Sequence, residues 1–205
     1  MKQLTAEWFE IRAGKVTASR VYDVISKTKS GDYAAGRAKY HLQLVTERLS
    51  KQITSAYVTP AMQWGIDREP EAKVRYQSKY EMVDEVGFVA HPIIPNSGAS
   101  PDGLVSTEGQ LEIKCPNLET HYDTLITGKI QARYIAQMQW QMACTGRAWC
   151  DYFSYDPRAE EGLEFFCKRV DRDVEYIHML EMEVSRFLDE VTLTVEKLNK
   201  LRQVR

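Results

Sequence analysis

The chain has 205 residues and a formal net charge of −2 at pH 7, with 43% hydrophobic and 27% charged residues. This composition is that of a folded globular protein and not of a disordered one. The chain has no apolar run long enough to cross a membrane, so a membrane protein is not expected. Because the net charge is slightly negative, any surface that binds DNA must be local. The length suits one substantial core, so residues 1–205 are expected to form a single domain.

Helical spacing dominates the first eighty residues. A short helix is expected around Trp8, and Thr17-Ala18-Ser19 should cap a second helix and form its first turn. Apolar residues keep helical spacing from 38 to 49. A longer helix is expected over 59–80, with Pro60 at its first position.

The spacing then changes to the alternation that is typical of strands. Strands are expected over 83–89, 103–106, 110–115, 148–155 and 163–170, with turns at 95–98 and 107–109. Helices are expected over 118–126, 132–144 and 174–198. The predicted fold class is therefore α/β (α+β), with a central mixed β-sheet flanked by helices.

Segment 100–114 carries the candidate catalytic residues. Asp102 follows Ser100-Pro101, and Glu112 and Lys114 stand two positions apart in the next expected strand. Because side chains alternate along a strand, Glu112 and Lys114 should share one face while the apolar residues between and beside them point into the core. The turn at 107–109 would fold Asp102 back beside them.

Two carboxylates and one ammonium on a single face suit the hydrolysis of a phosphodiester. Asp102 and Glu112, with the backbone carbonyl of Ile113, can supply the oxygen ligands that Mg²⁺ prefers. The metal would polarise the phosphoryl oxygens and activate water, so we expect two Mg²⁺ ions in each site, with Mn²⁺ able to substitute. Lys114 would orient the water and offset negative charge, or act as a base if its pKa is lowered.

The alternative is that Glu112 and Lys114 belong to a solvated surface, as most acid-x-Lys triplets do. A strand that looks buried seldom carries both charges without a role, and this favours the catalytic interpretation. Glu69 could add a third metal-binding carboxylate from the preceding helix, or it could face solvent. Gln137 lies in a largely apolar helix, where it could join the site or serve as a structural amide.

The cysteines occur at irregular intervals: Cys115, Cys144, Cys150 and Cys167. Their spacing matches neither a zinc site, nor a secreted disulfide scaffold, nor an iron–sulfur cluster. We expect reduced, mostly buried thiols in a protein that works in the cytoplasm, where it is made. The four histidines show no ligand spacing and are assigned no role.

Six blocks of residues occur in an order that is typical of one family. They are 8–12 with Gly14 and 17–19, then 64–69, 100–104, 111–116, 136–139 and 155–158. On these blocks the chain resembles the alkaline exonucleases of the YqaJ-type viral recombinases, the family of phage lambda exonuclease within the PD-(D/E)XK nuclease superfamily. The resemblance extends over nearly the whole chain.

The resemblance implies a Mg²⁺-dependent 5′-to-3′ exonuclease that degrades the 5′-ended strand of linear double-stranded DNA. It also implies a ring-shaped homotrimer and a partner, a single-strand annealing protein, that takes up the 3′ overhang. The residues that match the family's 5′-phosphate pocket are Arg12, Ser19 and Ser100, and those that match its active site are Glu69, Asp102, Glu112, Lys114 and Gln137. Pro60 departs from the family, which has a lysine near the DNA at that position.

Two other functions compete with the exonuclease. A restriction-type or junction-resolving endonuclease would share the fold and the active site but would also cut circular DNA. A DNA-end-binding module would bind without cleavage. The complete set of Asp102, Glu112 and Lys114 argues against the binding module, because a degenerate copy would be expected to lose one of them.

Overall fold

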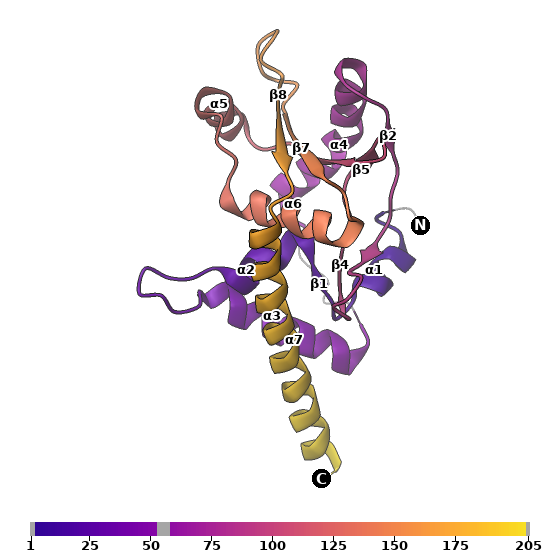
Figure 1. The fold of residues 1–205 in the computed structure, drawn as a ribbon, viewed down its shortest axis with the longest axis vertical. Coiled ribbons are helices and arrows are strands. Elements are labelled where there is room, and N and C mark those ends of the chain that lie inside the picture. The colour runs from indigo at the N-terminus through magenta and orange to yellow at the C-terminus, as the bar shows by residue number, and fades with distance from the viewer. Residues whose placement is uncertain (1–2, 53–57, 204–205) are drawn as a thin grey trace.

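A computed structural model of the protein describes residues 3–52 and 58–203. Within these residues, helices surround two β-sheets, and the last helix extends beyond the body of the molecule toward the C-terminus (Figure 1). The predicted class, a mixed sheet flanked by helices, is confirmed.

A five-stranded sheet carries the segment with the candidate catalytic residues. Its strands lie in the order β2 (Val83–Asp84), β5 (Gly103–Val105), β6 (Gly109–Lys114), β7 (Trp149–Tyr155) and β8 (Phe165–Asp171). All neighbours pair antiparallel except β6 and β7, which run parallel. A parallel pair needs a long crossover, and α5 (Leu118–Thr127) and α6 (Ala132–Thr145) supply it.

A second, three-stranded sheet was not predicted. It joins β1 (Val16–Thr17), β4 (Ser97–Ala99) and β3 (Val89–Ala90) in that order, with β1 and β4 parallel. The single strand predicted for 83–89 is wrong, because the two ends of this segment pair in different sheets. Its first residues join β5, and its last residue joins β4.

Gly98 lies inside strand β4 and not in the turn that was predicted there. A Cβ atom at this position would lie 2.5 Å from the carbonyl oxygen of Val89, so only glycine allows β3 and β4 to approach this closely. Gly109 likewise opens β6 instead of ending the turn, and its Cβ would meet the ring of Trp149. Both glycines mark a close approach of neighbouring strands.

Helices α4 (Pro60–Lys79) and α6 cover opposite faces of the five-stranded sheet. On one face, Leu111 and Ile113 of β6 pack in a cluster with Tyr76 of α4. On the other face, Tyr152 of β7 packs in a cluster with Met138 of α6. Because both faces are covered, a charged side chain on a central strand must find its partners inside the protein.

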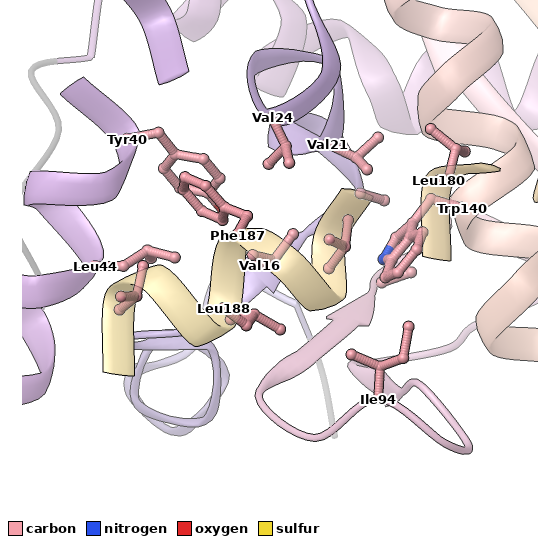
Figure 2. Close-up of a cluster of buried hydrophobic side chains, with 14 of the residues drawn as sticks. Val16, Val21, Val24, Tyr40, Leu44, Ile94, Trp140, Leu180, Phe187 and Leu188 are labelled. Atoms are coloured by element: carbon pink, nitrogen blue, oxygen red, sulfur yellow. The ribbon is translucent and has the colours of Figure 1, made fainter. Parts of the chain in front are cut away.

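A second apolar core forms around the C-terminal helix. The remaining helices are α1 (Ala6–Arg12), the 3-10 helix η1 (Ala18–Arg20), α2 (Val21–Ile25), α3 (Ala35–Ser50) and α7 (Val174–Gln203). Phe187 of α7 stacks on Tyr40 of α3, with ring centroids 5.6 Å apart, and Trp140 of α6 reaches the same core beside Leu180 (Figure 2). Helix α6 therefore belongs to both cores and fixes the sheet against the helical layer.

The cysteines are free thiols, as predicted. Cys144 and Cys150 are buried, whereas Cys115 and Cys167 are partly exposed. Among the helices of the described residues, none combines the length and the apolar character that crossing a membrane requires.

Candidate active site

The predicted catalytic residues meet at the end of strand β6. Glu112 and Lys114 lie on the same face and form an ion pair. Asp102 precedes β5, and its Oδ2 accepts a hydrogen bond from the backbone N–H of Ile113 at 2.6 Å. The antiparallel pairing of β5 with β6 therefore brings Asp102 beside the other two residues, as the strand alternation and the turn predicted.

Glu112 is completely buried and is held by two amides of α6, which continue into a hydrogen-bonded chain with β6. Gln137 Nε2 donates to Oε1 of Glu112 at 2.6 Å, and Gln141 Nε2 donates to Oε2 at 2.5 Å. Gln110 Nε2 in turn donates to Oε1 of Gln141 at 3.2 Å, and Thr145 donates to Oε1 of Gln110 at 2.8 Å. Because every member of this chain is bonded, the orientation of the Glu112 carboxylate is fixed.

The charges in this group are strongly coupled. Burial, and then the charges of Glu112 and Glu69, raise the pKa of Asp102 well above its ordinary value. Burial and the charge of Glu112 also raise the pKa of Glu69, against the opposing charge of Lys73. Burial would lower the pKa of Lys114, but the carboxylates of Glu112 and Asp102 outweigh it and raise that pKa. Three carboxylates thus lie near the ammonium of Lys114, and Lys73 adds a second positive charge near Glu69.

These residues open into a cleft of about 860 Å³. Its lining includes every residue that the sequence assigned to the active site or the phosphate pocket: Arg12, Ser19, Glu69, Ser100, Asp102, Glu112, Ile113, Lys114 and Gln137. They come from α1, η1, α4, α6 and the strands around β6. Pro60 does not line the cleft, although Ala61 and Met62 beside it do.

Trp8 connects two of the residues that match the phosphate pocket. The guanidinium carbon of Arg12 lies 3.7 Å from the centroid of the Trp8 ring. The Nε1–H of Trp8 donates to Oγ of Ser100 at 3.0 Å. One buried indole therefore positions Arg12 and Ser100, which lie far apart in the sequence.

The guanidinium of Arg12 is a partly buried cation. Burial, against the opposing charges of Tyr40 and Glu47, lowers its pKa to about 10, which leaves it charged at neutral pH. Its Nε is buried and has no hydrogen-bond partner. A guanidinium that stays charged at neutral pH and lines the cleft is suited to hold an anion there.

Ser19 lines the cleft from a short helical turn. Thr17 is the N-cap residue and the exposed Ser19 lies in the first helical turn, as predicted, but that turn is η1, a 3-10 turn of three residues, and the Thr17 side chain makes no capping hydrogen bond. The α-helix α2 begins only at Val21 and has five residues. A helix this short adds little dipole, and any contribution of Ser19 must come from its hydroxyl and backbone.

Sequence reasoning missed three residues of the site. Gln141 lies one helical turn after Gln137, and an amide in an apolar helix was a usable signal for both. Tyr134 places its ring 5.1 Å from the ammonium of Lys114. Trp8 gave no signal for its role, because its bond to Ser100 depends on the tertiary fold.

The donor set suits a hard divalent cation. Within residues 3–52 and 58–203, no three acidic, histidine or cysteine side chains are already arranged around a common metal position. The available ligands are nevertheless carboxylate oxygens from Asp102, Glu112 and Glu69, the type that Mg²⁺ prefers. Burial, and then the charges of Glu112 and Glu69, disfavour the ionised form of Asp102, and a bound cation would offset both effects.

Comparison with known proteins agrees with this geometry. The YqaJ-like viral recombinase domain matches residues 7–148. This range includes strands β1 to β6 and most of the residues that line the cleft. The chain belongs to the YqaJ-like viral recombinase family. No curated protein matches it.

Two crystal structures of LHK-Exo, an alkaline exonuclease from Laribacter hongkongensis, are similar to this YqaJ-like protein. In each case the sequences are 47% identical, the match covers 98% of this chain and 100% of the other, and the TM-score is 0.91. One of the two contains dAMP. A phage-related exonuclease from Haemophilus somnus 129PT is 12% identical with a TM-score of 0.70, over 90% of this chain and 96% of that one, and this similarity concerns the fold alone.

Proposed function

We propose that the protein is a Mg²⁺-dependent 5′-to-3′ exonuclease of linear double-stranded DNA, which leaves 3′ single-stranded overhangs for recombination by strand annealing. The observation that carries this proposal is the single cleft lined by all the predicted active-site and phosphate-pocket residues. The relative with 47% identity is an alkaline exonuclease, and its crystal structure in complex with dAMP, a nucleoside 5′-monophosphate, supports a nucleic-acid substrate for this chain.

In the proposed site, Asp102, Glu112 and Glu69 would hold Mg²⁺, together with the carbonyl of Ile113. The bound metal would supply Lewis-acid activation of the phosphodiester and of water, with two ions in each site and Mn²⁺ as a substitute. Gln137 and Gln141 keep the Glu112 carboxylate in a fixed orientation. The Lys114 ammonium forms an ion pair with Glu112. From there it can orient water and offset the negative charge that develops on the phosphate.

The topology of the DNA distinguishes this proposal from an endonuclease of the same fold. With Mg²⁺, the protein should digest linear duplex DNA to mononucleotides and leave a covalently closed duplex intact. Strand polarity is read by labelling the two ends separately, because only the 5′-ended strand should be shortened. Cleavage of the closed duplex would favour the endonuclease.

Arg12 is proposed to recognise the terminal 5′ phosphate. A guanidinium binds a phosphate through two parallel hydrogen bonds, and Trp8 and the buried environment hold Arg12 in place for this. Arg12→Ala should slow digestion of 5′-phosphorylated duplex about tenfold or more, roughly the loss of one charged hydrogen bond, and should change digestion of 5′-hydroxyl duplex much less. Initial rates on the two substrates measure this, and equal slowing of both would contradict the assignment.

The proposal includes a ring-shaped homotrimer that encloses the DNA and works with a single-strand annealing protein in the cytoplasm. Closed cyclic symmetry would keep a chain of net charge −2 on a polyanion without a basic surface. The free thiols agree with a reducing compartment. Light scattering at working concentrations should give three times the mass of the 23.6 kDa chain, and a monomer would argue against the ring.

A further inference from the structure

The cleft contains an arginine that neither the active site nor the 5′-phosphate pocket uses. Arg158 follows strand β7, lines the cleft and keeps 49% of its side chain exposed. Its Nε and Nη2 donate to the two carboxylate oxygens of Asp156, at 2.9 and 2.6 Å. Asp156 is completely buried and also accepts the backbone N–H of Arg158 at 2.9 Å.

Trp64 of α4 holds the same guanidinium from a second direction. The Arg158 guanidinium carbon lies 4.2 Å from the centroid of the Trp64 ring, and both residues line the cleft. The Nε1 of Trp64 is buried without a hydrogen-bond partner. Bidentate pairing and stacking together fix a cation at the cleft wall before any ligand arrives, so little side-chain entropy is lost on binding.

The charge of the cleft explains why such a cation is useful. Glu69, Asp102 and Glu112 converge at its base and repel the phosphates of DNA. Arg12 lies at α1, whereas Arg158 and Trp64 come from the β7–β8 connection and α4. The two arginines therefore belong to different elements around the catalytic carboxylates.

We infer that Arg158, held by Asp156 and Trp64, binds a backbone phosphate of the DNA in this cleft, separately from the contact of Arg12 with the terminal phosphate. This inference rests on the proposed nuclease function. In this inference, Arg158 contributes to the affinity for DNA by binding a phosphate within the strand, whereas Arg12 recognises the 5′ end. Arg158 is a DNA-contact residue and takes no part in the chemical step.

The chain provides a matched control in Arg169 of β8. Its Nε and Nη2 pair with the two oxygens of buried Asp151 at 2.9 and 3.0 Å, and its guanidinium carbon lies 3.4 Å from the centroid of the Trp149 ring. Arg169 also keeps 49% of its side chain exposed, but it does not line the cleft. Its removal breaks the same kind of pair and stack without removing a contact to DNA.

The test is the salt dependence of binding to a 5′-phosphorylated linear duplex, measured by fluorescence anisotropy with Ca²⁺ in place of Mg²⁺ to limit cleavage. The logarithm of the association constant falls as the logarithm of the salt concentration rises, and loss of one phosphate contact should make this negative slope shallower by about 0.9. Arg158→Gln should show this change and bind about tenfold more weakly at low salt. Arg158→Lys should keep the slope of the wild type, and Arg169→Gln should keep both the slope and the affinity.

An unchanged slope in Arg158→Gln would overturn the inference, and so would an equal loss of affinity in Arg158→Gln and Arg169→Gln. If Arg158→Gln does not fold, the double variant Asp156→Asn/Arg158→Gln leaves no unpaired buried charge and should show the same shallower slope. A wild type that binds the duplex but does not digest it would count against the proposed function alone. A wild type that does not bind would overturn both.

Discussion

Lys114→Ala should lower the rate of DNA cleavage by about 10²- to 10³-fold, the usual cost of removing one preorganised group that stabilises charge in a transition state. Lys114 pairs directly with Glu112, and its side chain is only 23% exposed, so water cannot easily replace it. The carboxylates beside it raise its pKa, so it is a cation in this site. Single-turnover rates on linear duplex with saturating Mg²⁺ measure the effect.

The same variant should fold and bind DNA ends. Glu112 keeps its hydrogen bonds from Gln137 and Gln141, so removing the lysine does not leave the buried carboxylate without donors. Far-UV circular dichroism and end binding with Ca²⁺ should therefore stay close to those of the wild type. Lys129→Ala, an exposed lysine outside the cleft, is the matched control and should cleave normally. A Lys114→Ala rate within about threefold of wild type would remove Lys114 from the mechanism.

The arrangement of the catalytic residues was predictable because it depends on local geometry. Alternation along β6 places Glu112 and Lys114 on one face, and a short hairpin brings Asp102 beside them. Both relations span few residues and were confirmed. The long amphipathic helix α7 was predicted for a similar reason, since a regular apolar stripe over many turns leaves little ambiguity.

What the sequence did not reveal depends on contacts between distant segments. Strand β1 has two residues and pairs with β4, about eighty positions later, so no local alternation could announce it. The segment at 83–89 has valines at both ends with Asp84, Glu85 and Gly87 between them, and only tertiary pairing assigns its two ends to different sheets. Gly98 looked like a turn residue because turns and close strand contacts both select glycine.

The chemistry of the site was also only partly visible. The sequence suggested a buried strand and offered Gln137 as a possible member of the site, but it did not show that α6 binds both oxygens of Glu112 through Gln137 and Gln141. Those bonds span 25 and 29 positions, so the partner of each amide could not be assigned from spacing. The roles of Glu69, Gln137 and the phosphate-pocket residues stay predictions, now with a common position in one cleft.

Mg²⁺ should stabilise the folded protein in the absence of DNA, because a cation would offset the repulsion among Asp102, Glu112 and Glu69. A ligand at about 100 times its dissociation constant adds roughly 2.7 kcal/mol to the free energy of unfolding. For a chain of this length, that corresponds to a rise in Tm of about 5–10 °C. Thermal denaturation at increasing Mg²⁺ concentration measures it independently of any activity.

Asp102→Asn tests whether that stabilisation comes from the proposed site. The amide has the size of the carboxylate and can still accept the N–H of Ile113, but it lacks the charge that would hold the cation. The variant should lose most of the Mg²⁺-dependent rise in Tm, and its cleavage rate should fall at least about a hundredfold. The control Asp189→Asn removes an exposed carboxylate on α7 and should change neither quantity. In the wild type, excess chelator should abolish cleavage, Mn²⁺ should restore it, and Ca²⁺ should support binding with little cleavage, because it accepts looser coordination than Mg²⁺. Full activity in chelator, or an equal rise in Tm for Asp102→Asn and wild type, would contradict a metal site built on Asp102.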